Sequence, residues 1–232
     1  YIAWEVDGII RASGTANPDS SITWTSISDD SRGGDTNNNG NGTSPAISNW
    51  YYIRLNDTSN DALCRFEYCN FYYGNYAGSN SHGALWCDNA GPTINHCEFA
   101  FHYHGIGVWG NSNPVISNCT FLNMTYSPII MDLLSNPSLS VGNSMFNVGY
   151  AALGLRTQNL TIDATWPQRN FAGYTNITYV LHGNVTVASG ATLVITAGTV
   201  LKGINTAIIV NGALQVNGVN GNRVVMTSSK DD

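Results

Sequence analysis

The 232-residue sequence contains few charged side chains. They make up 10% of the residues, and 9 Lys and Arg against 15 Asp and Glu give a net charge of −6. No cluster of basic residues is present. This argues against nucleic acid or an anionic membrane as a partner, because both are bound mainly through Lys and Arg.

The sequence also lacks the patterns of helices and of membrane spans. No apolar run reaches the roughly 18 residues that a membrane-spanning helix needs, and no segment shows helical periodicity. The chain begins at Tyr1 without a signal-peptide pattern. We therefore expect either a processed product or a piece of something larger.

A short phrase recurs four times between residues 61 and 147, and within it apolar and polar residues alternate with the period of a strand. The copies are Phe66-Glu-Tyr-Cys69-Asn-Phe71, Ile94-Asn-His-Cys97-Glu-Phe99, Ile116-Ser-Asn-Cys119-Thr-Phe121 and a looser Leu139-Ser-Val-Gly-Asn-Ser144-Met-Phe146. Their phenylalanines fall 28, 22 and 25 residues apart. A period of this length, built from strands and turns, indicates a solenoid whose units stack on their neighbours.

These phrases resemble the right-handed parallel β-helix repeats of secreted bacterial and archaeal cell-surface proteins, which have a pectin-lyase-like fold. The resemblance implies an all-β solenoid with coils of about 22–28 residues, in which like residues stack along the axis. The expected ladders contain Cys69, Cys97, Cys119 and Ser144 beside Phe71, Phe99, Phe121 and Phe146. The fold by itself does not define the chemistry, because such solenoids include lyases, adhesins and structural proteins.

A longer repeat overlies the short one. Gly8 and Gly14 recur as Gly212 and Gly218, 204 residues later, and Thr25 and Asp29 recur as Thr227 and Asp231, 202 residues later. The chain thus begins partway through one unit and ends partway through the next. We expect coils over residues 1–165, a weak seam near 165–175, and the start of the next unit over 166–232, continuous with the first.

A polar loop follows the first of these segments. The run Asp35-x-Asn37-x-Asn39-Gly40 matches the first half of a calcium loop, but Ala46 stands where an EF-hand has its bidentate glutamate. Similar acidic loops in the surface β-helix proteins imply a structural Ca²⁺ site. Its candidate ligands are Asp29, Asp30, Asp35, Asn37 and Asn39. A solvated polar turn is the alternative.

Seven Asn-x-Thr sequons predict a secreted, N-glycosylated surface protein. They begin at Asn41, Asn56, Asn118, Asn123, Asn159, Asn176 and Asn184. Chance occurrence in a chain rich in Asn and Thr is the alternative.

Five cysteines leave at least one unpaired within the chain. Adjacent coils of a solenoid lie close enough for a disulfide between Cys97 and Cys119, or between Cys69 and Cys97. The favoured interpretation is a ladder of small buried thiols. No paired Cys/His spacing suggests zinc.

Other side chains suggest sites more weakly. His102 and His104 share one face of a strand and could bind a metal with His96 or Glu98, although an outward polar strand or turn is favoured. Trp86 and Trp109 are candidates for stacking on sugars. For a polysaccharide lyase or hydrolase, the acids on neighbouring coils are Asp88 and Asp132, and the basic residues closest in sequence are Arg65 and Arg156. No paired carboxylates repeat at coil spacing, so catalysis is not expected.

Together these patterns predict a non-catalytic, extracellular structural protein of a sheath, surface layer, filament or stalk. Uncapped solenoid ends stack on further coils, so the expected partner is the chain itself, as a head-to-tail homopolymer or as tandem repeats. The alternatives are an adhesin or carbohydrate-binding β-helix and, less favoured, a polysaccharide lyase or hydrolase.

Overall fold

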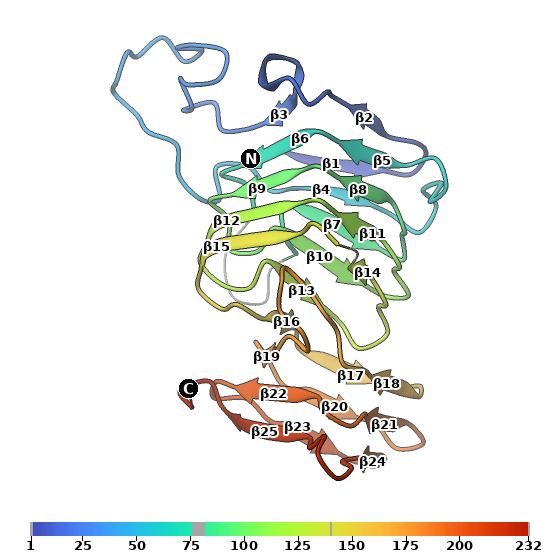
Figure 1. The fold of residues 1–232 in the computed structure, drawn as a ribbon. Helices are drawn as coiled ribbons and strands as arrows, with labels where there is room; N and C mark the ends of the chain where they lie inside the picture. The colour runs from blue at the N-terminus through green and yellow to red at the C-terminus, as the bar shows by residue number, and fades with distance from the viewer. Residues whose placement is uncertain (1, 76–81, 140, 232) are drawn as a thin grey trace.

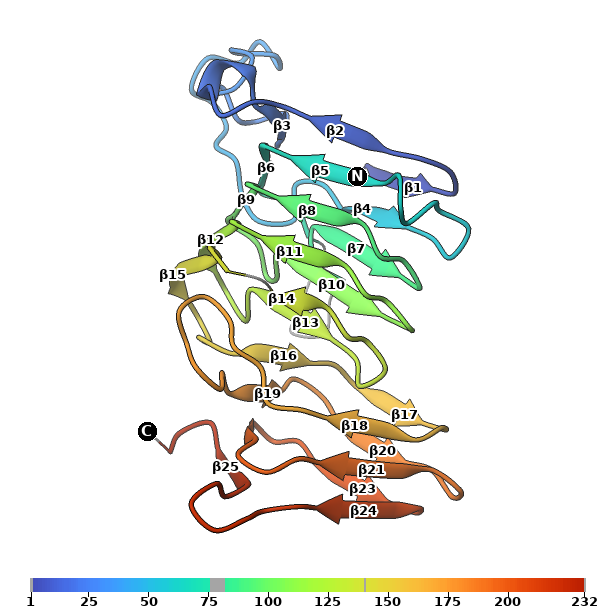
Figure 2. The same cartoon turned by 45° about the vertical axis from the view of Figure 1, so that its right-hand side comes forward.

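The computed structural model describes residues 2–75, 82–139 and 141–231, and its chain folds into a parallel β-solenoid (Figures 1 and 2). The strands stack from the N-terminal end of the solenoid to its C-terminal end, so the two termini lie at opposite ends of the molecule. The only helix among the described residues is a 3-10 turn, Pro18–Ser20. The predicted fold class is confirmed.

One sheet runs the full length of the solenoid and is called sheet A. It contains β1 (Ala3–Val6), β4 (Tyr52–Leu55), β7 (Leu85–Asp88), β10 (Ile106–Trp109), β13 (Ile129–Met131), β16 (Leu153–Leu155), β19 (Tyr179–Leu181), β22 (Val200–Gly203) and β25 (Val225–Ser228). Every ladder in it is parallel.

Two further strands complete each coil. They belong to sheets B and C in the first part of the solenoid and to sheets D and E in the second part. In the first part, sheet B contains β2 (Arg11–Ser13), β5 (Arg65–Glu67), β8 (Thr93–Asn95), β11 (Val115–Ser117) and β14 (Ser138–Leu139). Sheet C contains β3 (Ile22–Trp24), β6 (Cys69–Tyr72), β9 (Glu98–Ala100), β12 (Thr120–Met124) and β15 (Ser144–Val148).

In the second part, sheets D and E take these two places. Sheet D contains β17 (Gln158–Leu160), β20 (Val185–Val187) and β23 (Ile208–Val210). Sheet E contains β18 (Ala164–Trp166), β21 (Thr192–Ile195) and β24 (Ala213–Val216).

The alternation of apolar and polar residues decides which side chains enter the core. On β4, Ile53 and Leu55 point inward and are fully buried, whereas Tyr52 and Arg54 between them face outward. The parallel register places Leu85 beside Ile53. Each inward side chain therefore contacts an inward side chain of the next coil, which makes the core continuous along the axis.

A ladder of aromatic rings occupies the core under sheet C. Phe71 stacks on Phe99 with ring centroids 4.6 Å apart, and Phe99 stacks on Phe121 at 5.3 Å. Trp24 extends this ladder toward the N-terminus, with its ring centroid 4.9 Å from that of Phe71. The repeated sequence phrase did not reveal this member of the ladder. Phe171 ends it at the other side by an edge contact with Phe121 at 5.7 Å.

The expected register of the fourth copy is wrong by one residue. Phe121 pairs with Met145 instead of Phe146, and Phe146 is 74% exposed. Asn143, not Ser144, follows Cys119 in its ladder. The Asn143 side chain accepts a hydrogen bond from the Cys119 amide (3.0 Å) and donates one to the Ile116 carbonyl (2.9 Å). These two bonds satisfy buried backbone groups, which explains why an amide takes the place of the thiol.

The seam lies where sheets B and C end at β14 and β15 and sheets D and E begin at β17 and β18. Sheet A continues across it without a break. After β18 the chain leaves the coil at Pro167 and forms a loop closed by an antiparallel bridge between Phe171 and Tyr174. Phe171 is 2% exposed, so this loop covers the end of the aromatic ladder where a coil of sheet C would otherwise stack.

Replacing Phe99 by Ala removes a fully buried ring from the middle of the ladder, and Phe146→Ala removes an exposed one. We expect Phe99→Ala to lower the free energy of unfolding by about 3–5 kcal/mol and Phe146→Ala to change it by less than about 0.5 kcal/mol. Urea unfolding of both variants measures this difference. Similar losses in the two variants would contradict the observed register.

Candidate functional sites

The N-terminal end of the solenoid exposes side chains that point into the core. Trp4 and Val6 of β1 pair with Ile53 and Leu55 of β4, which are fully buried. Trp4 occupies the equivalent inward position but is 50% exposed. It is exposed because no described coil covers this end.

The C-terminal end shows the same feature on three faces. Val210, Val216 and Met226 pair with inward residues of the preceding coil and are 42–46% exposed. Within the described residues β23, β24 and β25 each have a strand on one side only. This end therefore combines open strand edges with half-exposed apolar side chains, a surface that favours pairing with further strands.

The two ends share a local structure as well as a sequence. The Thr25 hydroxyl donates to the Asp29 carboxylate at 2.5 Å, and the Thr227 hydroxyl donates to the Asp231 carboxylate at 2.7 Å. In both turns the backbone amide of the Asp also donates to the carbonyl of the serine three residues earlier. The long repeat thus corresponds to a repeated strand and turn.

Outside the core, sheet A carries a row of aromatic rings with an arginine against each of its two tryptophans. The Arg54 guanidinium lies 4.1 Å from the Trp86 ring centroid, and that of Arg156 lies 3.4 Å from the Trp109 ring centroid. The two tryptophan rings meet at 4.5 Å, and His82 contacts both. Such cation–π contacts stabilise the outer face of the sheet.

This row brings together three of the residues that were considered for catalysis. Asp88 forms an ion pair with Arg54 at 2.5 Å, and the buried Asp132 accepts hydrogen bonds from the Gly110 amide and from Ser135. Burial raises the pKa of Asp132 and lowers that of Arg156.

Arg65 lies elsewhere, in sheet B beside Glu67 at 3.7 Å. The acids of the sheet A row are thus already engaged with protein groups.

Trp86 and Trp109 are adjacent, as a sugar-stacking pair would need, but they are only 6% and 8% exposed. Arg54, Arg156 and His82 cover much of their ring surface. Little ring area is left for a sugar.

The five candidate calcium ligands lie in the long loop between β3 and β4, which projects from the N-terminal end (Figure 1). Asp29 is buried and accepts hydrogen bonds from Thr25 and Ser31. The Asp35 carboxylate accepts hydrogen bonds from the backbone amides of Asn39 and Gly40.

The side-chain amides of Asn37 and Asn39 both donate to Thr43, and Asp30 has one buried carboxylate oxygen without a hydrogen-bond partner. In the part of the chain that the structure describes, no three acidic, His or Cys side chains converge as a metal site.

The sequon asparagines differ in exposure. Four are exposed, namely Asn41, Asn118, Asn159 and Asn184. Asn56, Asn123 and Asn176 are half-buried, and the amide nitrogen of Asn176 donates to the Gly198 carbonyl.

All five cysteines are free and buried, so the Cys97–Cys119 disulfide is not formed in this structure. The Cys97 thiol donates to the Phe66 carbonyl, and that of Cys119 donates to the Ser117 carbonyl. Cys69, Cys97 and Cys119 occupy successive coils as a ladder of small buried groups.

His102 and His104 are fully buried, contrary to the expectation of an outward strand or turn. The ring nitrogens of His102 lie 3.0 Å from the Gly74 carbonyl oxygen and 2.7 Å from that of Phe71. His104 Nδ1 lies 2.8 Å from the Ser127 carbonyl oxygen. Sequence periodicity could not reveal this, because the two imidazoles satisfy backbone carbonyls where the chain turns between sheets.

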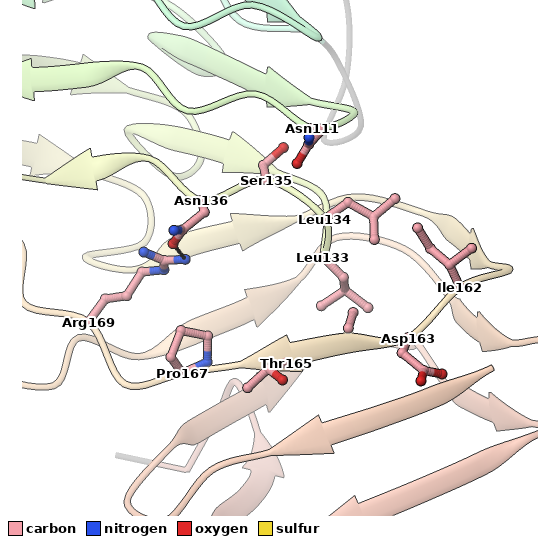
Figure 3. A pocket seen from close by; sticks show the side chains of 11 residues that line it. Asn111, Leu133, Leu134, Ser135, Asn136, Ile162, Asp163, Thr165, Pro167 and Arg169 are labelled. Atoms are coloured by element: carbon pink, nitrogen blue, oxygen red, sulfur yellow. Dashed lines mark hydrogen bonds between the residues drawn. The ribbon is translucent and has the colours of Figure 1, made fainter.

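A cavity of about 540 Å³ opens at the seam (Figure 3). Leu133 and Leu134 line it on one side and Ile162 on the other, and Arg169 donates hydrogen bonds to Asn136 (2.8 Å) and to the Pro137 carbonyl (3.2 Å). The weak seam expected near residues 165–175 indicated an interruption in this part of the chain. It did not indicate a cavity.

With this geometry the chain is an all-β parallel β-helix, and the comparison with known families agrees. The family model described as a pectate-lyase-like beta helix domain matches residues 168–232, the part that follows the seam. This match and the solenoid confirm the pectin-lyase-like β-helix fold that the resemblance implied. No curated protein and no solved structure gives a significant match. Within the described residues no helix is long and apolar enough to cross a membrane.

Denaturing the protein without a reductant and counting thiols with Ellman's reagent should give five reactive groups, because all five cysteines are free. The folded protein should react slowly, because thiols this deeply buried are shielded from the reagent. A count of three in the denatured protein would instead establish one disulfide.

Acid should destabilise the protein through its buried imidazoles. Burial lowers the pKa of His102 to about 4, below the value of about 6.5 in an unfolded chain. The unfolded state therefore binds the proton first, and the stability that neutral His102 contributes above pH 6.5 is lost as the pH falls toward 4. Each unit of pKa shift corresponds to about 1.4 kcal/mol.

Urea unfolding at pH 7 and pH 4.5 should show a smaller acid effect in His102→Asn than in the wild type, even though the variant is less stable at pH 7. Equal acid effects in both proteins would exclude His102 as the cause.

Proposed function

We propose that this chain is a non-catalytic structural protein of an extracellular surface, such as a sheath, surface layer, filament or stalk. It assembles end to end by stacking the first coil of one unit on the last coil of another. The half-exposed inward residues at both ends, Trp4 at one and Val210, Val216 and Met226 at the other, carry this proposal. Covering them with a further coil continues the core and pairs the open strand edges.

The first coil of a second chain offers apolar inward side chains that suit the C-terminal end. By sequence, β23, β24 and β25 correspond to β1, β2 and β3. Stacking these strands in the repeat's register places Trp4 over Ile208, Ala12 over Val216 and Trp24 over Met226. All six side chains point inward in their own coils. Apolar groups therefore meet apolar groups on all three faces.

The strand count also predicts how the next unit is oriented. β1 belongs to sheet A, whereas β23, its counterpart one repeat later, belongs to sheet D. With three strands in each coil, the 22 strands from β1 to β22 make seven coils and one further strand. Each unit therefore starts one face further around the axis, and its projecting loop, the counterpart of residues 25–51, points in a new direction. The contact is heterologous and builds an open filament.

The exposure of the sequons supports the surface location. Four of the seven sequon asparagines are exposed, as an N-glycosylated surface protein requires. The loop that follows β3 carries the acidic and amide side chains of the expected Ca²⁺ site, and calcium bound there would order the loop without a catalytic role.

The polysaccharide lyase or hydrolase is the less favoured alternative. Its candidate acids, Asp88 and Asp132, are held by Arg54 and by backbone amides. The binding-module alternative rests on another surface, the outer face of sheet C.

Two neighbouring residues of β23 allow a matched test of assembly. Val210 points toward the core and Ile209 points outward beside Thr186, yet both are similarly exposed, at 42% and 44%. Val210→Glu should abolish filament formation, because it places a charge in the stacked core. Ile209→Glu should leave filaments intact. Electron microscopy and sedimentation of the two variants decide between these outcomes.

A wild-type protein that remains strictly monomeric at high concentration would contradict end-to-end assembly. Loss of filaments in both variants would point to association through the outer face of sheet D instead of the solenoid end.

A further inference from the structure

A second cavity, of about 370 Å³, lies on the outer face of sheet C near the N-terminal end. Three parts of the chain enclose it: the turn around Pro18, Arg32 from the long loop, and the outward side chains of β6, β9 and the turns before them. The residues from those strands and turns are Tyr68, Asn70, Tyr72, His96 and Glu98. We call it the sheet C pocket.

Two stacked rings form one wall of the sheet C pocket. Tyr68 and His96 lie 4.6 Å apart with nearly parallel planes. Both residues have left-handed backbones, with φ of 52° and 51°, a conformation that is uncommon for a side chain such as that of Tyr68 and less so for Asn, Asp and His. Asn118 occupies the next step of this row with φ 53°. Aromatic residues at two of these three steps give the pocket an aromatic wall.

The remaining walls offer hydrogen-bonding groups of both kinds. The Tyr72 hydroxyl donates to Glu98 Oε1 at 2.6 Å, and Glu98 Oε2 accepts no hydrogen bond within the described residues. Burial, and then Glu98, raise the pKa of Tyr72, which keeps its proton on the shared hydrogen bond. The Asn70 amide nitrogen donates to Ser21 and Thr23, so its oxygen is the group left for a ligand.

We propose that the sheet C pocket binds a neutral saccharide of one or two residues. A sugar ring packs against the Tyr68–His96 wall, and its hydroxyls donate to Glu98 and Asn70 and accept from Arg32. Aromatic rings beside a few placed polar groups are the usual composition of a specific small-molecule site, and the volume lies at the small end of the range for such sites.

The charges of the pocket favour a neutral ligand. Glu98 and Arg32 both line the cavity and carry opposite charges, and the Arg32 guanidinium lies 5.5 Å from the centroid of the Tyr72 ring, whose hydroxyl donates to Glu98. The two charges offset each other, so neither an anionic nor a cationic group gains a net attraction. Tyr68 is half-buried and His96 is exposed, in contrast to the covered rings of Trp86 and Trp109. The accessible aromatic wall is therefore on sheet C. This inference is independent of the end-to-end assembly.

Saturation-transfer difference NMR of the whole chain tests the proposal with a panel of common neutral mono- and disaccharides and the matching uronic acids. At least one neutral sugar should receive saturation. The signal should fall at least tenfold in Tyr68→Asn, since Asn tolerates the left-handed backbone and lacks the ring, and also in Glu98→Gln.

The matched control is Tyr73→Asn, because Tyr73 also has a left-handed backbone (φ 60°) and stacks on Phe101 at 4.9 Å, outside the pocket. It should bind as the wild type does. The proposal is overturned by a panel that gives no saturation, by a uronic acid that binds better than its neutral parent, or by equal losses in Tyr68→Asn and Tyr73→Asn.

Discussion

The structure depends on inward side chains stacking in register along the solenoid axis. No single coil encloses a core, because each contributes only a few inward residues, and these are buried only when coils cover them on both sides. The aromatic ladder through Phe71, Phe99 and Phe121 shows this most directly. Each ring is fully buried and stacks on a ring of a neighbouring coil.

The same constraint explains the two places where the solenoid is irregular. At the seam the ladder cannot continue, since β15 turns Phe146 outward, and the loop carrying Phe171 covers the last ring instead. At the two ends described by the structure, the inward residues remain half-exposed. At the seam the loop that carries Phe171 covers the exposed side of the core. At the ends no described segment does so, and the proposed assembly would cover the inward residues with a further coil.

Because the inward residues hold the fold, the outward residues can differ from face to face. On sheet A they form a packed row of arginines and tryptophans, with its acids engaged in ion pairs and backbone hydrogen bonds. On sheet C they leave an open pocket beside an accessible pair of rings. The pectate-lyase-like match describes the stacking of the coils, and it does not distinguish between these surfaces.

The sequence by itself determined the fold class, the repeat and most of the core. Apolar and polar residues alternate along each strand, and inward residues recur once per coil, so both periods can be read directly from the sequence. Phe71, Phe99 and Phe121 were correctly placed for that reason. The register of the fourth copy could not be obtained this way, since hydrogen bonds from Asn143 to backbone groups of the neighbouring coil decide it.

The tertiary structure alone decided which outward residues meet. Spacing placed His102 and His104 on an outward strand or turn. In the structure both imidazoles are buried, and their ring nitrogens lie within hydrogen-bond distance of backbone carbonyl oxygens. The sequence suggested Trp86 and Trp109 as a sugar platform, but two arginines distant in sequence cover them. The sheet C pocket joins residues from 15 to 98 across several coils. Local periodicity records which way a side chain points, and only packing between distant segments decides what it touches.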